Sequence, residues 1–197
     1  MGAEPAVATA LFPDRLAEAV ERKRSQLLVG LDPRPDLLPV ELAGDAHLSR
    51  EAAADACGRF CRGIVDAVAP HVVGVKPQLA FFEALGADGL RAFEDACAYA
   101  RSAGLIVLAD AKRGDIGSTS RAYSTAYLEP LGGGRPRADA LTVNPYLGRE
   151  SLEPFLAACR REGAGIFCLV KTSNAGGDVQ DLALSDGRRV WQHAIGR

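Results

Sequence analysis

The chain has 197 residues, of which 48% are hydrophobic, and its 23 Lys and Arg against 25 Asp and Glu give a formal net charge of −2 at pH 7. This balance argues against a strongly basic nucleic-acid surface and against a polybasic membrane anchor. No apolar run approaches the roughly 18 residues of a membrane-spanning helix, so we expect one domain over residues 1–197 with one substantial core.

The first 15 residues, MGAEPAVATALFPDR, lack the basic start of a signal peptide, and Glu4 and Pro5 interrupt them. The five cysteines are an odd number in a chain that needs no disulfides, so we expect reduced thiols and a cytoplasmic protein. Cys57 and Cys61 have the i, i+4 spacing of a helix. They are either half of a metal site or, the interpretation we favour, part of a buried helix face.

Apolar runs of strand length alternate along the chain with segments of helical periodicity. The expected strands cover residues 26–31, 71–77, 104–110, 138–144 and 165–171. The expected helices are one that begins after an N-cap at Ser49, one over 88–103 with Asp88 as N-cap, one over 151–162 and one over 187–196.

The expected strands are apolar throughout, which is typical of parallel strands buried on both faces. After the first gap they recur about every 30 residues, the spacing of a (β/α)8 barrel. We therefore predict an α/β fold of the TIM-barrel type with about five of its eight strands present in this chain. A doubly wound open sheet is the competing architecture, but the first strand-to-helix turn, GLDPRPDL (30–37), lacks a G-x-G-x-x-G pattern.

Charged residues gather where the predicted strands end: Asp32, Lys76, Asp110, Lys112 and Lys171. In a barrel this end carries the active site. Asp110 and Lys112 are two residues apart on one strand, so we expect them to point to the same face, with Lys76 joining them from the preceding strand. Because such charges are costly to bury unpaired, the array is either a structural salt-bridge network or a catalytic device.

The segment DAKRGDIGST (110–119) resembles the D-x-K-x-x-D-I-x-x-T signature of the orotidine 5′-phosphate decarboxylase family. Four other segments support a resemblance to the longer, mycobacterial-type branch of that family: LVGLDP (28–33), GVKPQLAFFEALG (74–86), LTVNPYLG (141–148) and LVKTSNAGG (169–177). The resemblance implies a (β/α)8 barrel that works as a homodimer, without metal or organic cofactor. The implied reaction of pyrimidine biosynthesis releases CO₂ from orotidine 5′-phosphate to give uridine 5′-phosphate (UMP).

The matching motif positions imply roles for the charged array. Lys112 is the proton donor to the pyrimidine carbon that loses CO₂, Asp110 lies against the substrate carboxylate, and Lys76 orders the charges and bonds the ribose. Asp115 and Thr119 resemble the residues that reach into the neighbouring site of the dimer.

Three further positions match substrate contacts of the family. Asp32 resembles the aspartate that binds ribose, and Ser173 resembles the serine that contacts the pyrimidine. Asn144 lies at the mouth of the fourth predicted strand and is expected to face substrate. The residues that grip the phosphate in the family follow its seventh and eighth strands and have no match here.

Three more strand–helix units need about 90 residues at the barrel spacing, more than follow Lys171. We therefore expect a partial sequence of a normal decarboxylase, incomplete at its C-terminus. The alternatives are a catalytically incompetent truncated barrel, a related Mg²⁺-dependent sugar-phosphate decarboxylase or aldolase, and a binding protein in which the array is only structural.

Overall fold

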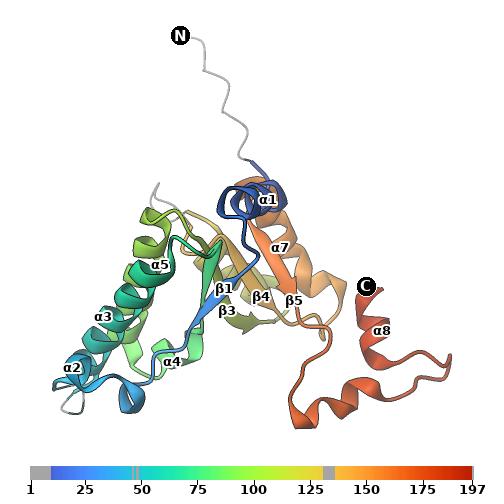
Figure 1. The fold of residues 1–197 in the computed structure, drawn as a ribbon. Helices are drawn as coiled ribbons and strands as arrows, with labels where there is room; N and C mark the ends of the chain where they lie inside the picture. Colours follow the sequence, from blue (N-terminus) through green and yellow to red (C-terminus); the bar gives the residue numbers. More distant parts are fainter. Residues whose placement is uncertain (1–9, 46, 48, 131–135, 197) are drawn as a thin grey trace.

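The computed structural model describes residues 10–45, 47, 49–130 and 136–196, and its centre is one sheet of five parallel strands (Figure 1). Each strand pairs with the next one along the chain, and the order is β1 Leu28–Leu31, β2 Gly74–Pro77, β3 Ile106–Arg113, β4 Ala140–Val143 and β5 Gly165–Cys168. Residues 1–9, on which the expectation about a signal peptide partly depends, lie outside the described residues.

Four long helices return the chain from one strand to the next: α3 Arg50–Val68, α5 Gly86–Ser102, α6 Gly117–Leu128 and α7 Arg149–Glu162. The remaining helical segments are α1 Phe12–Lys23, α2 Val40–Ala43, α4 Leu79–Glu83 and α8 Val190–Ile195, with 3-10 turns η1 Pro35–Leu37 and η2 Ala175–Asp181. A doubly wound sheet reverses its strand order at a switch point, whereas these strands follow the chain order without reversal. The predicted barrel-type α/β fold is therefore confirmed, as five strands of a barrel.

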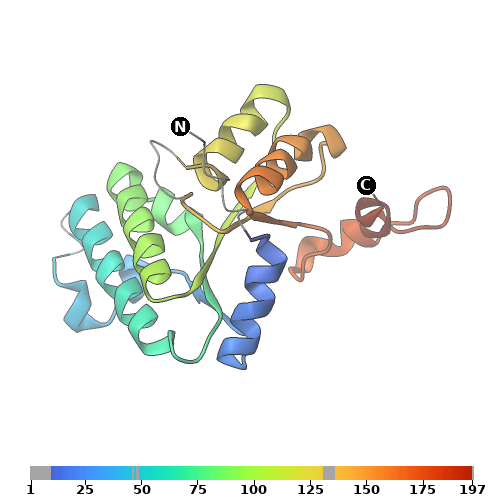
Figure 2. The ribbon, with the colours of Figure 1, turned by 90° about the horizontal axis from the view of Figure 1, so that it is seen from above.

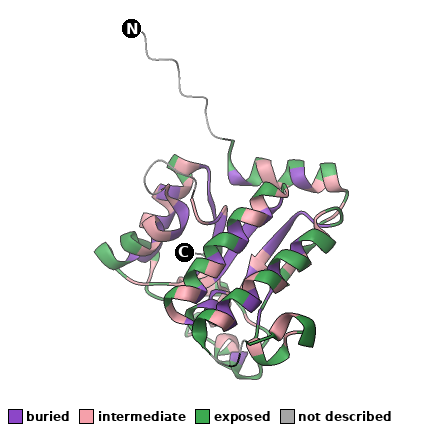
Figure 3. Cartoon of the chain, turned by 90° about the vertical axis from the view of Figure 1, so that its left-hand side faces the viewer, coloured by how far each residue is buried: buried purple, intermediate pink, exposed green. Residues whose placement is uncertain are grey.

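Different helices cover the two faces of the sheet (Figure 2). One face packs under the four long helices, and the buried residues of this main core include Phe93 and Phe155. The other face packs against α1, and the members of this smaller core are Phe12, Ala19, Val73, Ile106, Leu108 and Ala140. Buried positions accordingly concentrate in the strands and on the sheet-facing sides of the helices (Figure 3).

Helix α1 is fixed to the start of the last two strands. Arg15 donates to Asp139 Oδ1 at 2.6 Å and to the Gly163 carbonyl at 3.1 Å, just ahead of β4 and β5. Gly165 leaves room for the Phe12 ring, because a Cβ there would lie 2.4 Å from Phe12 Cδ1. This helix was not among those expected from the sequence.

The expected N-cap at Ser49 is confirmed, since its hydroxyl accepts from the Ala52 amide at 3.0 Å. The expected N-cap at Asp88 is wrong. Helix α5 begins two residues earlier, because α4 runs almost directly into it and Gly86, with φ +68°, makes the turn between them. Asp88 lies in the first turn instead, where its carboxylate pairs with Arg91.

Cys57 and Cys61 are fully buried on α3, as the interpretation of a buried helix face predicted. Burial raises the pKa of Cys57 to about 11 and that of Cys61 to about 12, so both are neutral thiols at pH 7. Within the described ranges, no three His, Cys, Asp or Glu side chains come together as metal ligands. None of the helices described there combines the length and apolar character needed to cross a membrane.

Candidate active site

The carboxylate of Asp110 is the centre of a charged array at the C-terminal end of the sheet. Lys76 at the end of β2 donates to Asp110 Oδ2 at 2.8 Å, and Lys112 donates to Asp110 Oδ1 at 2.6 Å. The two ammonium groups thus bind different oxygens of one carboxylate. The predicted meeting of these three side chains is confirmed.

Asp110 is 6% exposed, while the side chains of Lys76 and Lys112 are 34% and 47% exposed. Burial by itself would raise the pKa of Asp110, but hydrogen bonds from Lys112 and Lys76 outweigh it and hold that pKa below its usual value of 3.8. The carboxylate is therefore ionised at neutral pH, and two cations with access to solvent stand beside it.

Two further side chains bind Asp110 and were not singled out from the sequence. Gln78 Nε2 donates to Asp110 Oδ2 at 3.0 Å, and Thr142 Oγ1 donates to Asp110 Oδ1 at 3.0 Å. The sequence did contain a signal for each of these two residues. Gln78 follows Lys76 by two residues, and Thr142 is the one polar residue between the apolar neighbours Leu141 and Val143 of a buried strand.

Asp32 and Asn144 lie at the same end of the sheet. The Asp32 carboxylate lies near Gly30, where a Cβ would be 3.4 Å from its Oδ1, and Gly30 is the register partner of Lys76. Asn144 donates its backbone N–H to the Arg113 carbonyl at 2.8 Å, while its side-chain oxygen accepts from the Tyr146 amide at 2.9 Å. Both side chains are on exposed residues beside the array.

Asp115 and Thr119 follow β3 and, within the described part of the chain, form no hydrogen bond or ion pair with the side chains of the array. Asp115 is partly buried and its carboxylate accepts from the adjacent Ile116 amide at 2.7 Å. Thr119 is exposed in the first turn of α6, and Ile116, the residue before that helix, is 58% exposed. Among the described residues, no ion pair links Asp115 to Lys76 or Lys112.

The segment after β5 carries the last two residues of interest. Ser173 is exposed. Lys171, expected at the shared rim, instead forms an ion pair with Asp181, and its ammonium lies 5.8 Å from the centre of the Trp191 ring. The sequence groups Lys171 only with the other charged strand ends, and in the structure its side chain contacts η2 and α8 rather than Asp110.

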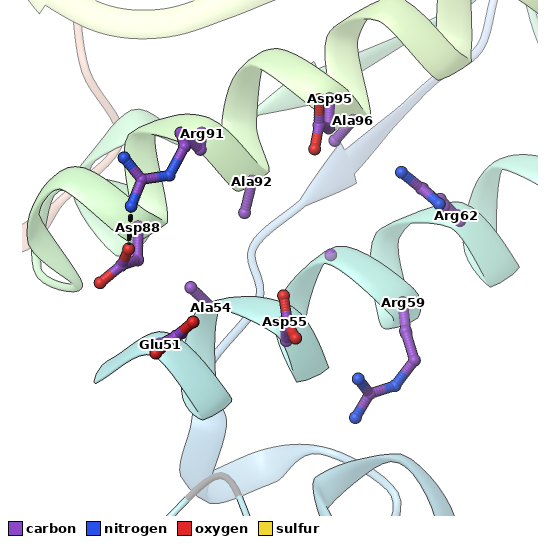
Figure 4. Close-up of a pocket in the computed structure, with 11 residues that line it drawn as sticks. Glu51, Ala54, Asp55, Arg59, Arg62, Asp88, Arg91, Ala92, Asp95 and Ala96 are labelled. Atoms are coloured by element: carbon purple, nitrogen blue, oxygen red, sulfur yellow. Dashed lines mark hydrogen bonds and ion pairs between the residues drawn. The ribbon is translucent and has the colours of Figure 1, made fainter. Parts of the chain in front are cut away.

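A separate groove of about 330 Å³ lies between α3 and α5, on the outer helical layer (Figure 4). Small residues, among them Ala54, Gly58 and Ala92, line it together with negatively charged carboxylates and positively charged guanidinium groups. Asp88 and Arg91 form an ion pair there. None of the predicted site residues lines it. We place the candidate site at the array, because that is where a buried carboxylate and two partly exposed ammonium groups meet.

The parallel sheet carries its charged residues at the C-terminal ends of β2 and β3. This arrangement places the protein in the class of barrel-type α/β proteins, which hold their functional groups at the strand C-termini. Residues 25–194 match the model of the orotidine 5′-phosphate decarboxylase / HUMPS family. The chain therefore belongs to this family.

Curated relatives and solved structures agree with this assignment. The chain is 49% identical over 185 residues to the orotidine 5′-phosphate decarboxylase of Rhodopirellula baltica, which covers 92% of this chain and 61% of that protein. It is 45% identical to the one of Haloarcula marismortui, over 93% of this chain and 61% of that protein. The structure of Leishmania donovani OMP decarboxylase matches with a TM-score of 0.74 and 34% identity, over 95% of this chain and 64% of that one. The chain thus spans about three fifths of the length of these curated relatives.

Proposed function

We propose that the protein decarboxylates orotidine 5′-phosphate to uridine 5′-phosphate in pyrimidine biosynthesis. The observation that carries the proposal is the Asp110 carboxylate held between the ammonium groups of Lys76 and Lys112 at the C-terminal end of the sheet. The names of the relatives above support the same reaction, and the two ammonium groups beside one carboxylate offer a way to stabilise the developing charge without an organic cofactor.

In this reaction the bond between the ring carbon and the carboxylate breaks, CO₂ leaves, and the electron pair stays on the ring carbon. The ring offers no sink for that pair, so the developing negative charge needs an external cation. The Lys112 ammonium stabilises a charge that appears only on the way to the transition state, which is how fixed charges accelerate a reaction. Lys112 then gives its proton to the same carbon, and a C–H bond replaces the C–C bond.

Asp110 and Lys76 set the electrostatics around the proton donor. Asp110 is ionised at neutral pH because its pKa is lowered, so it disfavours the substrate carboxylate in the ground state and keeps Lys112 charged. Lys76 balances Asp110 from the other oxygen and bonds the ribose. In this proposal Asp32 binds the ribose, Ser173 contacts the pyrimidine, and Asn144 faces the substrate.

We further propose that the protein acts as a cytoplasmic homodimer in which Asp115 and Thr119 reach the site of the partner. Their positions support this, because Asp115 binds the adjacent Ile116 amide rather than its own array, and Thr119 and the apolar Ile116 are both exposed at the start of α6. Residues 1–197 belong, in this proposal, to a single barrel domain, since one sheet joins β1 to β5.

The Mg²⁺-dependent alternative requires a carboxylate that is free to bind a divalent cation. Both oxygens of Asp110 already accept from ammonium groups, and a divalent cation there would meet two positive charges. The positions of the two lysines therefore argue against Asp110 as a ligand of Mg²⁺.

The test measures release of labelled CO₂ from carboxyl-labelled orotidine 5′-phosphate by the purified protein. We expect UMP formation that is unaffected by EDTA. Activity that EDTA abolishes would favour the Mg²⁺-dependent alternative. A protein that is folded and binds 6-aza-UMP but releases no CO₂ would contradict the proposed reaction.

A further inference from the structure

Thr142 uses its whole hydrogen-bonding capacity at the array. Its hydroxyl donates to Asp110 Oδ1 at 3.0 Å and accepts from the backbone amides of Ala111 and Lys112, each at 2.9 Å. A hydroxyl has one proton to donate and two lone pairs to accept with, so all three are engaged. Thr142 is itself 8% exposed, which leaves little solvent to replace these bonds.

The two amides belong to an irregular stretch of β3. Lys112 has φ +50°, in the left-handed region that non-glycine residues avoid, and the register of β3 with β4 shifts between Ala109 and Arg113. Such a shift leaves strand amides without ladder partners. The Thr142 hydroxyl, on the neighbouring strand, supplies the missing acceptor for two of them.

The backbone of Lys112 decides where its ammonium lies. A residue in the left-handed region directs its side chain differently from a residue in a regular strand, so a bond that keeps Lys112 in that region also aims its Nζ. The same hydroxyl binds the Asp110 oxygen that accepts from Lys112 Nζ. The Thr142 side chain thus contacts both the carboxylate of Asp110 and the backbone amide of Lys112.

We propose that Thr142 is a positioning residue for the proposed decarboxylation, which acts by fixing the Lys112 backbone and the Asp110 carboxylate in their reactive arrangement. The inference rests on the proposed function for its kinetic consequence. The arrangement itself is testable without any turnover. Thr142 contacts the reacting groups of the protein and transfers no proton to substrate.

The first experiment compares Thr142→Val, which keeps the shape and loses the hydroxyl, with Thr142→Ser, which keeps the hydroxyl. We expect Thr142→Val to lower kcat about 100-fold with a smaller change in KM, since misplacing a reacting group by about 1 Å has effects of that size. Thr142→Ser restores kcat to within about fivefold of the parent, because the three hydrogen bonds return. Thr125→Val, a matched change on α6 away from the array, leaves kcat unchanged.

The second experiment follows the Asp110 carboxyl by carbon NMR as a function of pH. We expect a pKa below the ordinary value in the parent and in Thr142→Ser, and a higher pKa in Thr142→Val. If the parent forms no UMP but the Asp110 pKa moves in Thr142→Val alone, the proposed function fails while the positioning by Thr142 stands. A Thr142→Val protein with parental kcat and parental Asp110 pKa would overturn the inference.

A third measurement needs no variant and covers the case in which Thr142→Val does not fold. The amides of Ala111 and Lys112 in the parent protein should exchange with solvent far more slowly than the amides of exposed loop residues. Exchange at the rate of exposed amides would show that the hydroxyl does not hold them and would overturn the inference.

Discussion

The carboxylate of Asp110 and the ammonium of Lys112, two positions apart in one strand, form an ion pair of 2.6 Å. In a regular strand, side chains two positions apart share a face but stand side by side along the strand. Here the strand is irregular, and its left-handed turn at Lys112 brings the two charges into direct contact. The predictions below follow from this contact and from the packing around it.

Removing the ammonium of Lys112 should abolish most of the proposed activity. We expect Lys112→Ala to lower kcat by at least about 1,000-fold, because one side chain supplies both the stabilising charge and the proton. The control is Lys171→Ala, which removes an ammonium that pairs with Asp181 instead. Steady-state assays of UMP formation check this, and a loss of less than about tenfold in Lys112→Ala would rule out the assigned role.

Asp110 should make stability depend on pH in acid. Its pKa is lowered in the folded protein, so its contribution is complete above the unfolded pKa and is lost as pH falls through the folded one. We expect Asp110→Asn to lower the free energy of unfolding by about 1–2 kcal/mol at pH 7, a moderate value because both lysines are partly exposed. Urea unfolding from pH 7 to pH 2 measures the difference, which should shrink below about pH 4. A difference that does not depend on pH would contradict the assignment.

The anchoring of α1 is testable through Arg15. Its guanidinium reaches Asp139 and the Gly163 carbonyl, so we expect Arg15→Ala to lower the free energy of unfolding by about 1–2 kcal/mol. Arg22→Ala is the control, because Arg22 on the same helix forms an exposed pair with Glu18, worth about 0.5 kcal/mol at most. Equal effects of the two changes in thermal or urea unfolding would show that α1 is not fixed through Arg15.

Two glycines should respond to alanine with opposite signs. A Cβ at Gly89 would lie 1.9 Å from the Phe82 carbonyl oxygen, in the close contact of α4 with α5, so Gly89→Ala should destabilise the fold by about 1–3 kcal/mol. Gly63 is exposed on α3 with no atom within 4 Å of such a Cβ. Gly63→Ala should therefore stabilise the protein by up to about 1 kcal/mol, because alanine favours the helix. Chemical denaturation of both variants checks the two signs.

The strands and most of the array could be predicted because their signals are local. Buried parallel strands form continuous apolar runs, and Lys76, Asp110 and Lys112 each stand where such a run ends. The bounds were less accurate: β5 ends at Cys168 rather than at residue 171, and β3 continues to Arg113. The irregular ladder at the end of β3 explains the second difference, since it depends on a partner strand 30 residues away.

Helices α1 and α6 were missed for reasons that differ between the two. Helix α6 is rich in serine, threonine and glycine, which favour helices weakly. It is held by tertiary bonds instead: Ser120 donates to the Ser151 carbonyl at 2.6 Å and Ser124 to the Pro154 carbonyl at 3.0 Å. Contacts between distant residues leave little trace in a local pattern. Helix α1 differs, because a local signal was present: Phe12, Leu16, Ala19 and Val20 recur at helical spacing, with Pro13 at the start of the helix and Arg22 and Lys23 in its last turn.

Lys112 and Arg24 are the non-glycine residues with positive φ in the described ranges. Arg24 closes a surface helix, and a glycine there would relieve strain without chemical consequence. At position 112 a glycine would also relax the backbone, but it would remove the reactive ammonium together with its ion pair to Asp110. The strained conformation is therefore held at a residue whose side chain both stabilises a buried carboxylate and supplies the proton of the proposed reaction.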